Sequence, residues 1–548
     1  MNNPNVPQDG LAGFTENLRA DLLAGFLVFL IALPLCIGIS IASGFGPVGG
    51  LFTAIIGGLI VGPFQGCRMA IKGPAAGLIP IAIGCVEAFR GNPETAAIAY
   101  QCALAVVVVT GIIQIIFGLV RAGVMSDFFP NAPVHGMLAS IGILIISTQI
   151  QSVFGQVATK GAGAVQRLTE IPGNIAHLNP AITLIGLLSL AILFIMPRIK
   201  HPLARKIPGP MLVLLVSIPL GLYFGVTNDH TYQFAGATYE IVAKNHAVQL
   251  GGNMVDLITF PNFSFLTHPI SIQFIVLFAL VGSIESTASA KAIDTLDLYK
   301  RKTDFNRDLL AVGIGNTAAG LVGGLPMISE IVRSSANINN GGKTRWSNVW
   351  HGLFLLIVLA AIPWAIAYIP RAALGAMLVF TGLRLASWKE FRHMFHVGKE
   401  QLAVFLITIA VTIGKDLLWG IIAGVVAEMV LNLVHRAPAS ALFKAAVVAH
   451  DDAPDTVRLA VQKSATFTNY ISLKARIFAV DPAKNVVVDL AKASFVDANV
   501  MEYFDEIAED FARQNRKFTV IGLERHAALS HSKHAARKLS AGEVHAAA

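Results

Sequence analysis

The sequence predicts a polytopic α-helical membrane protein, one that crosses the bilayer many times and continues into a small α/β domain. Of its 548 residues, 54% are hydrophobic and only 14% are charged, and the mean hydropathy is +0.64. A soluble globular protein carries about 25% charged residues because its surface must be hydrated. Long apolar segments follow one another from about residue 21, and this pattern stops near residue 436. These observations favour hydrocarbon as the solvent for most of the chain.

Apolar segments predict a transmembrane domain at residues 21–436, after an N-terminal segment of residues 1–20. About fourteen segments occur, seven on each side of a polar stretch from Asn228 to His268. Their approximate bounds are 21–43, 47–63, 74–90, 96–120, 131–151, 180–197, 209–226, 271–293, 308–324, 327–339, 347–368, 370–386, 400–414 and 416–435. The first run, Leu22 to Ile41, is too long for a signal-peptide core and is followed by no evident cleavage site.

The distribution of lysine and arginine predicts the orientation. If the N-terminus is inside and the spans alternate, inside loops hold about three times as many basic residues as outside loops. Lys72 and Arg384 are among the inside residues of this count, and Arg371 is among the outside ones. Both termini are therefore expected in the cytoplasm. The net charge of +8 comes from these scattered clusters and does not indicate nucleic-acid binding.

The third segment of each set of seven begins in an unusual way. Gly73-Pro74-Ala75 opens one and Gly323-Gly324-Leu325-Pro326 opens the other, each at the head of a short apolar stretch. Interrupted helices at matching places in two halves indicate the binding site of a transporter built from inverted repeats. The free amides of such a helix start favour an anion. The alternative is that both Gly-Pro pairs simply begin ordinary helices.

Segment eight carries a charge inside an apolar stretch. Glu285 lies within 271–293, and Ser289 follows one helical turn later on the same face. An ionisable group at membrane depth is costly unless it is paired or hydrated, so Glu285 is a functional candidate. The two oxygen-bearing side chains suit a cation such as sodium. The alternative is a structural glutamate that is protonated or paired with a nearby arginine.

The C-terminal part predicts a small cytoplasmic domain at residues 440–531 and a disordered tail at 532–548. Val486 to Leu490 and Phe518 to Gly522 have the pattern of buried strands, and Ala498 to Gln514 has that of an amphipathic helix. The tail histidines are too loosely spaced to predict a metal site. Four cysteines lie in or beside apolar segments with no metal-ligand spacing, and no cofactor is indicated. They are Cys36, Cys67, Cys85 and Cys102.

Several motifs, taken in their order, resemble the sulfate permease (SulP) family of anion transporters over most of the chain. The part after residue 440 resembles the STAS domain (sulfate transporter and anti-sigma antagonist) of that family. The matching stretches are Ala24-Gly25-Phe26 through Pro34, Gly73-Pro74-Ala75, Pro130 through Gly136 leading to Gln149, Ile207-Pro208-Gly209-Pro210, Gly323 through Pro326 with Arg333 behind it, and Ile369-Pro370 through Leu374.

The resemblance implies a seven-plus-seven inverted repeat with core and gate domains, a homodimer, and residence in a bacterial cytoplasmic membrane. It also implies an anion site between the facing starts of segments three and ten. The implied substrate-binding residues are Phe26, Ala75, Ala76, Ser329 and Arg333, and the implied coupling-cation residues are Glu285, Ser289 and Glu330.

Two positions depart from the family pattern. Glu330 occupies a place near the start of segment ten where the family usually has a small residue. It is expected to pair with Arg333, to be protonated when the anion binds, or to hold a cation together with Glu285. In the STAS-like part, Asp497 is followed by Ala498-Asn499, where phosphorylated relatives have serine. Regulation by phosphorylation is therefore not expected there.

The predicted function is secondary active transport of a small inorganic anion, with bicarbonate favoured, sulfate next, and sodium or protons as the coupling ion. One basic residue at the expected site suits a small anion better than a bulky polyanion. The alternatives are a passive anion channel and a nucleobase or dicarboxylate symporter of the same fold. No nucleophile–base or metal constellation occurs in the loops, so an enzyme is not expected, and no Walker motif supports ATP-driven transport.

Overall fold

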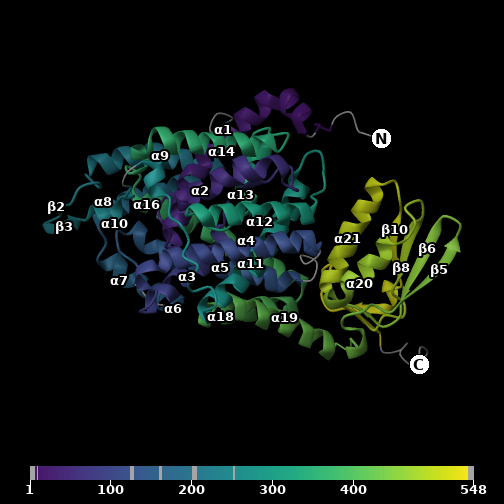
Figure 1. Cartoon of the computed structure of the whole chain (residues 1–548). Helices are drawn as coiled ribbons and strands as arrows, with labels where there is room; N and C mark the ends of the chain where they lie inside the picture. Colours follow the sequence, from purple (N-terminus) through teal and green to yellow (C-terminus); the bar gives the residue numbers. More distant parts are fainter. Residues whose placement is uncertain are drawn as a thin grey trace. The chain divides into compact units, whose positions relative to one another are not determined.

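The computed structural model describes residues 6–8, 10–123, 129–159, 163–199, 201, 207–250, 253–435 and 437–540. The chain divides into two compact units. The first unit comprises residues 1–123 and 141–385, and the second comprises residues 124–140 and 386–548. Figure 1 shows the helices of the first unit and, in yellow-green, the α/β part of the second.

The first unit is almost wholly helical. Each apolar segment predicted in its range contains a helix, and α1 and α14 run side by side, as do α4 and α12 (Figure 1). The main helices are α1 (Gly10–Ala42), α2 (Gly49–Ile56), α3 (Ile79–Gly91), α4 (Ala99–Leu119), α8 (Pro180–Ile195), α9 (Gly209–Tyr223), α11 (Pro269–Leu296), α12 (Phe305–Val322), α13 (Ile331–Asn339), α14 (Trp346–Ala361) and α16 (Arg371–Leu385). Helix α5 (Asn131–Val153) begins in the second unit and continues into the first.

Six helices of the described residues are long and apolar enough to cross a membrane. They are Gly10–Ala42, Ala96–Leu119, Asn131–Val153, Pro180–Arg198, Pro269–Leu296 and Leu417–Val434. Among the other predicted spans, the third and tenth contain short helices, α3 and α13, because both segments are interrupted. Backbone polar groups in hydrocarbon must be bonded within the protein, so an interrupted helix needs another backbone to pair with.

That pairing occurs between the starts of the third and tenth segments. Strand β1 (Ile71–Pro74) pairs with β4 (Met327–Glu330) in antiparallel register, with Lys72 opposite Ser329 and Gly73 opposite Ile328. A 3-10 turn, Ala76–Leu78, then leads into α3, while α13 follows β4 directly. The predicted interruption of both segments is therefore present. The helix of the third segment begins later than the predicted bound at residue 74, because Pro74 lies on β1 and α3 begins at Ile79.

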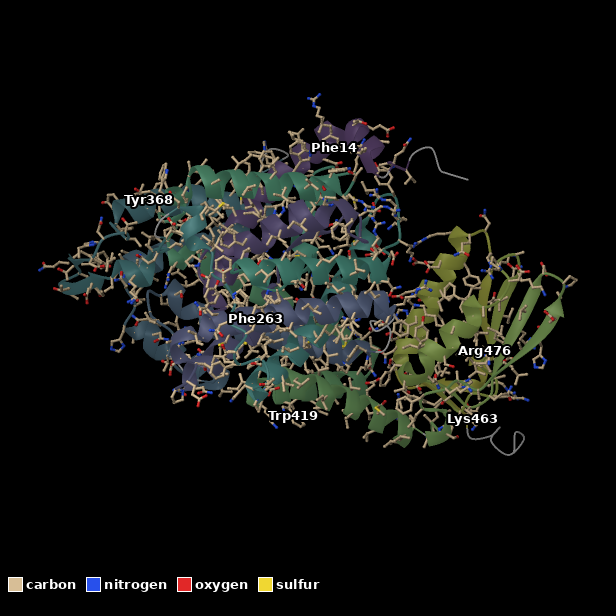
Figure 2. All side chains as sticks on the ribbon, viewed as in Figure 1. Phe14, Phe263, Tyr368, Trp419, Lys463 and Arg476 are labelled. Atoms are coloured by element: carbon tan, nitrogen blue, oxygen red, sulfur yellow. The ribbon has the colours of Figure 1, made fainter. Side chains whose placement is uncertain are left out.

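The polar stretch between the two sets of segments forms a small hairpin. Strands β2 (His230–Phe234) and β3 (Ala237–Ile241) pair antiparallel, and the short helix α10 (Ala243–His246) follows. Phe14 on α1 and Tyr368 just before α16 lie toward opposite ends of the first unit (Figure 2). The remaining short helices are α6 (Ala164–Thr169), α7 (Ile171–Ala176) and α15 (Pro363–Ile366).

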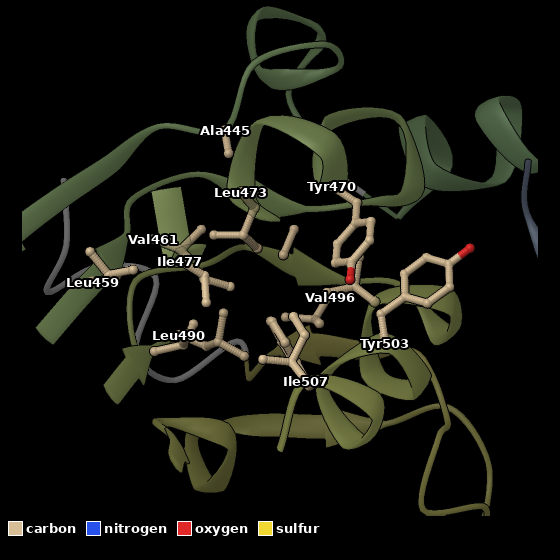
Figure 3. Packing of buried hydrophobic residues seen from close by; sticks show 14 of the residues in the cluster. Ala445, Leu459, Val461, Tyr470, Leu473, Ile477, Leu490, Val496, Tyr503 and Ile507 are labelled. Atoms are coloured by element: carbon tan, nitrogen blue, oxygen red, sulfur yellow. The ribbon is translucent and has the colours of Figure 1, made fainter. Parts of the chain in front are cut away.

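The second unit joins three helices and the start of α5 to an α/β domain. One four-stranded sheet has the order β10-β8-β6-β5, and a second has the order β11-β12-β9-β7. Side chains such as Tyr470, Leu473 and Ile507 pack in the domain's core (Figure 3). The elements are α17 (Trp388–Val397), α18 (Lys399–Gly414), α19 (Leu417–Val434), β5 (Val447–Ala453), β6 (Thr456–Val461), β7 (Ser464–Ala465), α20 (Phe467–Phe478), β8 (Asn485–Asp489), β9 (Phe495–Val496), α21 (Ala498–Arg513), β10 (Phe518–Ile521), β11 (His526–Ala528) and β12 (Arg537–Leu539).

The strands and the helix predicted for this domain are present as β8, α21 and β10. The boundary of the predicted tail was placed too early. Strand β12 lies inside 532–548 and pairs with both β11 and β9. The cause is that a three-residue strand with two basic residues has no apolar pattern to reveal it. Residues 541–548 lie outside the described part of the chain.

The start of α21 docks on the membrane helices of the same unit through a buried polar cluster. Asn499 accepts a hydrogen bond from the backbone N–H of Asn131 at 2.7 Å and donates to Glu428 Oε1 on α19 at 3.2 Å. Gln401 on α18 donates to the same oxygen at 2.8 Å. Asp497 caps α21 by accepting from the backbone N–H of Val500, and burial raises the pKa of this carboxyl to about 6. This cluster links the α/β domain to α5, α18 and α19.

Asn499→Ala is expected to loosen this docking, because it leaves the Asn131 N–H and one bond of the buried Glu428 carboxylate unsatisfied. An unsatisfied buried polar group costs about 1–3 kcal/mol. Hydrogen exchange should therefore speed up at the first turn of α21 and at the start of α5. Gln514→Ala at the exposed far end of α21 is the matched control. Equal exchange in both variants would contradict a role for Asn499 in docking.

Candidate functional site

Two glutamates meet the amides at the start of the third segment. Glu330 is the residue before α13, and its carboxylate lies near the backbone N–H of Ala76. The carboxylate of Glu285, in the buried half of α11, lies against Gly77. The two carboxylates repel one another electrostatically. The amides predicted to attract an anion thus lie close to two carboxylates of the same protein.

Two glycines make these close approaches possible. A Cβ atom added at Gly77 would lie 2.0 Å from Glu285 Oε1, and one added at Gly73 would lie 2.1 Å from Arg333 Nη1. Real Cβ atoms are not found at such distances, and both neighbouring groups are buried. Gly73 and Gly77 are therefore required by the charged side chains packed against them, and not by an unusual backbone conformation.

Arg333 is 1% exposed and lies on the first turn of α13. Its Nη2 approaches the Pro74 carbonyl oxygen at 3.4 Å, while Nε and Nη1 have no hydrogen-bond partner among the described residues. Glu330 and Arg333 attract one another electrostatically, but among the described side chains they form no direct ion pair. Two donor nitrogens of Arg333 are therefore available to an anion.

Ser329 belongs to a buried charged network that the sequence did not reveal. Lys72 Nζ donates to Ser329 Oγ at 2.6 Å and to Asp308 Oδ2 at 2.7 Å, and Ser329 Oγ donates to Asp308 at 3.1 Å. Asp308 also accepts from the backbone N–H groups of Gly66 and Cys67. The assignment of Lys72 to an inside loop was wrong, because it lies on β1 with its side chain fully buried. The hydroxyl of Ser329 thus has two protein partners already.

The other predicted site residues are placed as follows. Ala75 donates its backbone N–H to the Pro326 carbonyl at 3.3 Å, which ties the two interrupted segments together. Ser289 is buried on α11, one turn beyond Glu285. The ring of Phe26 is 40% exposed and packs against Phe29 and Phe354.

His351 on α14 is a further buried polar residue that the sequence analysis missed. It is fully buried, interacts electrostatically with Arg333, and neither ring nitrogen has a hydrogen-bond partner among the described residues. Its signal was a lone histidine in an otherwise apolar segment. Glu285 Oε2 and Glu330 Oε1 also lack partners in the described part of the chain. Buried polar atoms are rarely unpaired, so such a group points to a place for water, an ion or a substrate.

Comparison with known proteins identifies the family. The profile of the "Sulfate permease family" matches residues 18–408. The chain is 26% identical over 515 residues to a candidate sulfate transporter, YvdB, of Bacillus subtilis (strain 168), covering 93% of this chain and 92% of that one. It is 25% identical over 499 residues to the bicarbonate transporter BicA of Picosynechococcus sp. (strain ATCC 27264 / PCC 7002 / PR-6), covering 90% and 83%.

A solved structure has the same fold across both parts of the chain. It is that of the murine Solute Carrier 26 family member A9 anion transporter in the inward-facing state, with a TM-score of 0.65 and 15% identity. The match covers 92% of this chain and 85% of that one. It confirms the predicted polytopic helical fold with a C-terminal STAS-like α/β domain. The family is one of transporters and not of enzymes. The chain therefore belongs to the sulfate permease family and is a multi-pass membrane protein that transports anions.

Proposed function

We propose that this protein is a secondary active transporter of a small inorganic anion, with bicarbonate as the favoured substrate and sulfate as the next, driven by sodium or protons. The observation that supports it most is the closeness of the Glu330 and Glu285 carboxylates to Ala76 and Gly77. A passive pathway for anions has no need of two negative charges at the amides where the anion is expected to bind.

The carboxylates and the anion compete for the same amides in this proposal. While both glutamates are ionised, they hold the amides and repel the substrate. A proton or a sodium ion that neutralises them frees the amides, so that cation and anion bind together. Glu285 Oε2, Glu330 Oε1 and the Ser289 hydroxyl are hard oxygen atoms of the kind that bind such cations. Arg333 then supplies its unpartnered Nε and Nη1 to the anion.

The charge balance favours bicarbonate over sulfate. Arg333 is the cation expected to contact the anion, since Lys72 is already paired with Asp308. A monoanion is neutralised by one arginine, whereas a dianion leaves an excess charge in a buried site, which is costly. The names of the two relatives, one a candidate sulfate transporter and the other a bicarbonate transporter, support the same two substrates.

The proposal extends to the location of the protein and to its oligomeric state. We place the protein in a bacterial cytoplasmic membrane with both termini inside, and we propose that it is a homodimer. Mass photometry in detergent and in lipid nanodiscs should give twice the mass of one chain. A single-chain mass in both environments would contradict the dimer.

Uptake by proteoliposomes tests the proposed function. Radiolabelled bicarbonate, at mildly alkaline pH, and radiolabelled sulfate should be compared under an imposed sodium gradient and an imposed proton gradient. We expect one gradient to concentrate bicarbonate above its external level, with sulfate competing weakly. Anion flux that only follows the anion's own gradient would indicate a channel. Transport of a nucleobase or a dicarboxylate in preference to bicarbonate would contradict the assigned substrate.

A further inference from the structure

Two cavities of the first unit lie on either side of a contact between α1 and α16. The first has a volume of about 310 Å³ and is lined by residues that include Leu35, Met377, Thr381 and Arg384. The second has a volume of about 270 Å³ and is lined by residues that include Gly38, Thr148, Leu374 and Arg371. Each is large enough for a hydrated small anion.

A single helical turn separates the cavities. On α1, Leu35 lines the first cavity and Gly38, three residues later, lines the second. On α16, Met377 lines the first cavity and Leu374 lines the second. A Cβ atom at Gly38 would lie 3.5 Å from Leu378 Cδ1 and 3.6 Å from Leu374 Cβ, which is ordinary packing contact. Gly38 and Leu374 therefore form a thin apolar barrier.

An arginine stands at each end of α16, one in each cavity. Arg371 is the first residue of the helix and Arg384 lies in its last turn, so they are about 20 Å apart along the axis. Neither forms a hydrogen bond or an ion pair with a described residue, and Arg371 Nε is buried. A cation at the N-terminus of a helix opposes the helix dipole, so helix stability does not explain Arg371.

The remaining charges of the second cavity do not neutralise Arg371. Glu87 and Arg167 also line it, and they pair with each other at 4.0 Å. Among the described residues the cavity keeps an excess of one positive charge. The first cavity contains Arg384 among mostly apolar groups. Low-dielectric walls around one sign of charge concentrate the opposite ion and raise its rate of entry.

We infer that these cavities are the two entry vestibules of the anion pathway, and that Arg371 and Arg384 are the residues that attract the anion, one on each face of the membrane. The inference rests on anion transport by this chain. In this inference each arginine raises the affinity for the anion on one side of the membrane. The turn at Gly38 and Leu374 is the barrier that separates the two sides.

Kinetics measured from each face test the two arginines. In proteoliposomes of known orientation, Arg371→Gln should raise KM about tenfold for transport from one face only, and Arg384→Gln should do so from the other. The maximal rate should change little, and the effect should fall at high salt because screening weakens attraction over distance. Arg90→Gln, an exposed charge at the end of α3 that lines neither cavity, is the matched control.

Labelling from each face tests the barrier. In a background without the four native cysteines, Thr381→Cys should react with a membrane-impermeant thiol reagent from one side and Thr148→Cys from the other. The inference would be overturned if both cysteines were labelled from the same side. It would also be overturned if neither arginine variant changed the KM measured from either face. A wild-type protein that moves no anion would instead remove the function on which the inference rests.

Discussion

Asp308→Asn is expected to lower the free energy of unfolding by about 3–5 kcal/mol, because it leaves the buried ammonium of Lys72 without its counter-charge. Lys72 and Asp308 are 0% and 2% exposed and lie 2.7 Å apart. Through the hydrogen bonds of Lys72 with Asp308 and Ser329, they hold β1, β4 and α12 together. The measurement is thermal unfolding of the purified variant in detergent, together with its yield in the membrane.

The double variant Lys72→Met, Asp308→Asn separates the charge from the hydrogen bonds. The asparagine oxygen can still accept from the Gly66 and Cys67 amides, while both charges are gone. Removing both partners of a buried pair is often close to neutral, so most of the lost stability should return. Asp304→Asn, the exposed cap of the same helix, is the control. A double variant as unstable as Asp308→Asn would contradict this explanation, because the lost stability would then not come from an unpaired Lys72 charge.

Much of the fold was predictable because hydropathy is a local signal. Each predicted apolar segment holds a helix, and the Gly-Pro starts correctly marked the interrupted segments. The pairing of β1 with β4 was not predictable, because four-residue strands whose partners lie more than 250 positions away leave no periodic pattern. Lys72 shows the same limit. By sequence alone its charge fits a loop, because its partner Asp308 lies 236 positions away in the chain.

The candidate site was predictable in its parts but not in its arrangement. Glu285 stood out as a charge in an apolar stretch, Glu330 as a departure from the family pattern, and the helix start as an anion site. Their meeting at Ala76 and Gly77 depends on how α11 and α13 pack against that start, which the sequence does not encode locally. His351 was missed because a lone histidine in an apolar segment is more often a satisfied core residue than part of a site.

The largest functional effect is expected from Glu330→Gln, which should bind the anion more tightly yet fail to concentrate it. Glutamine keeps the shape of the side chain but removes a charge that repels the substrate. Repulsion between charges a few ångströms apart near a protein surface amounts to several kcal/mol, so affinity should rise at least about tenfold. Binding measured by thermal shift with bicarbonate should then lose its dependence on the coupling ion, and gradient-driven uptake should fall to passive flux.

Two comparisons decide whether Glu330 belongs to the coupling device. Glu285→Gln should likewise uncouple uptake, whereas Arg333→Ala should mainly weaken anion affinity and leave the ion dependence in place. Glu94→Gln, exposed in the loop after α3, should change neither. If Glu330 serves only as a structural partner of Arg333, then Glu330→Gln and Arg333→Ala should be equally damaging, and the double variant no worse than either. The absence of a direct ion pair between Glu330 and Arg333 in the described structure argues against a purely structural role for Glu330. A carboxylate close to the Ala76 amide competes with the anion and not with the arginine.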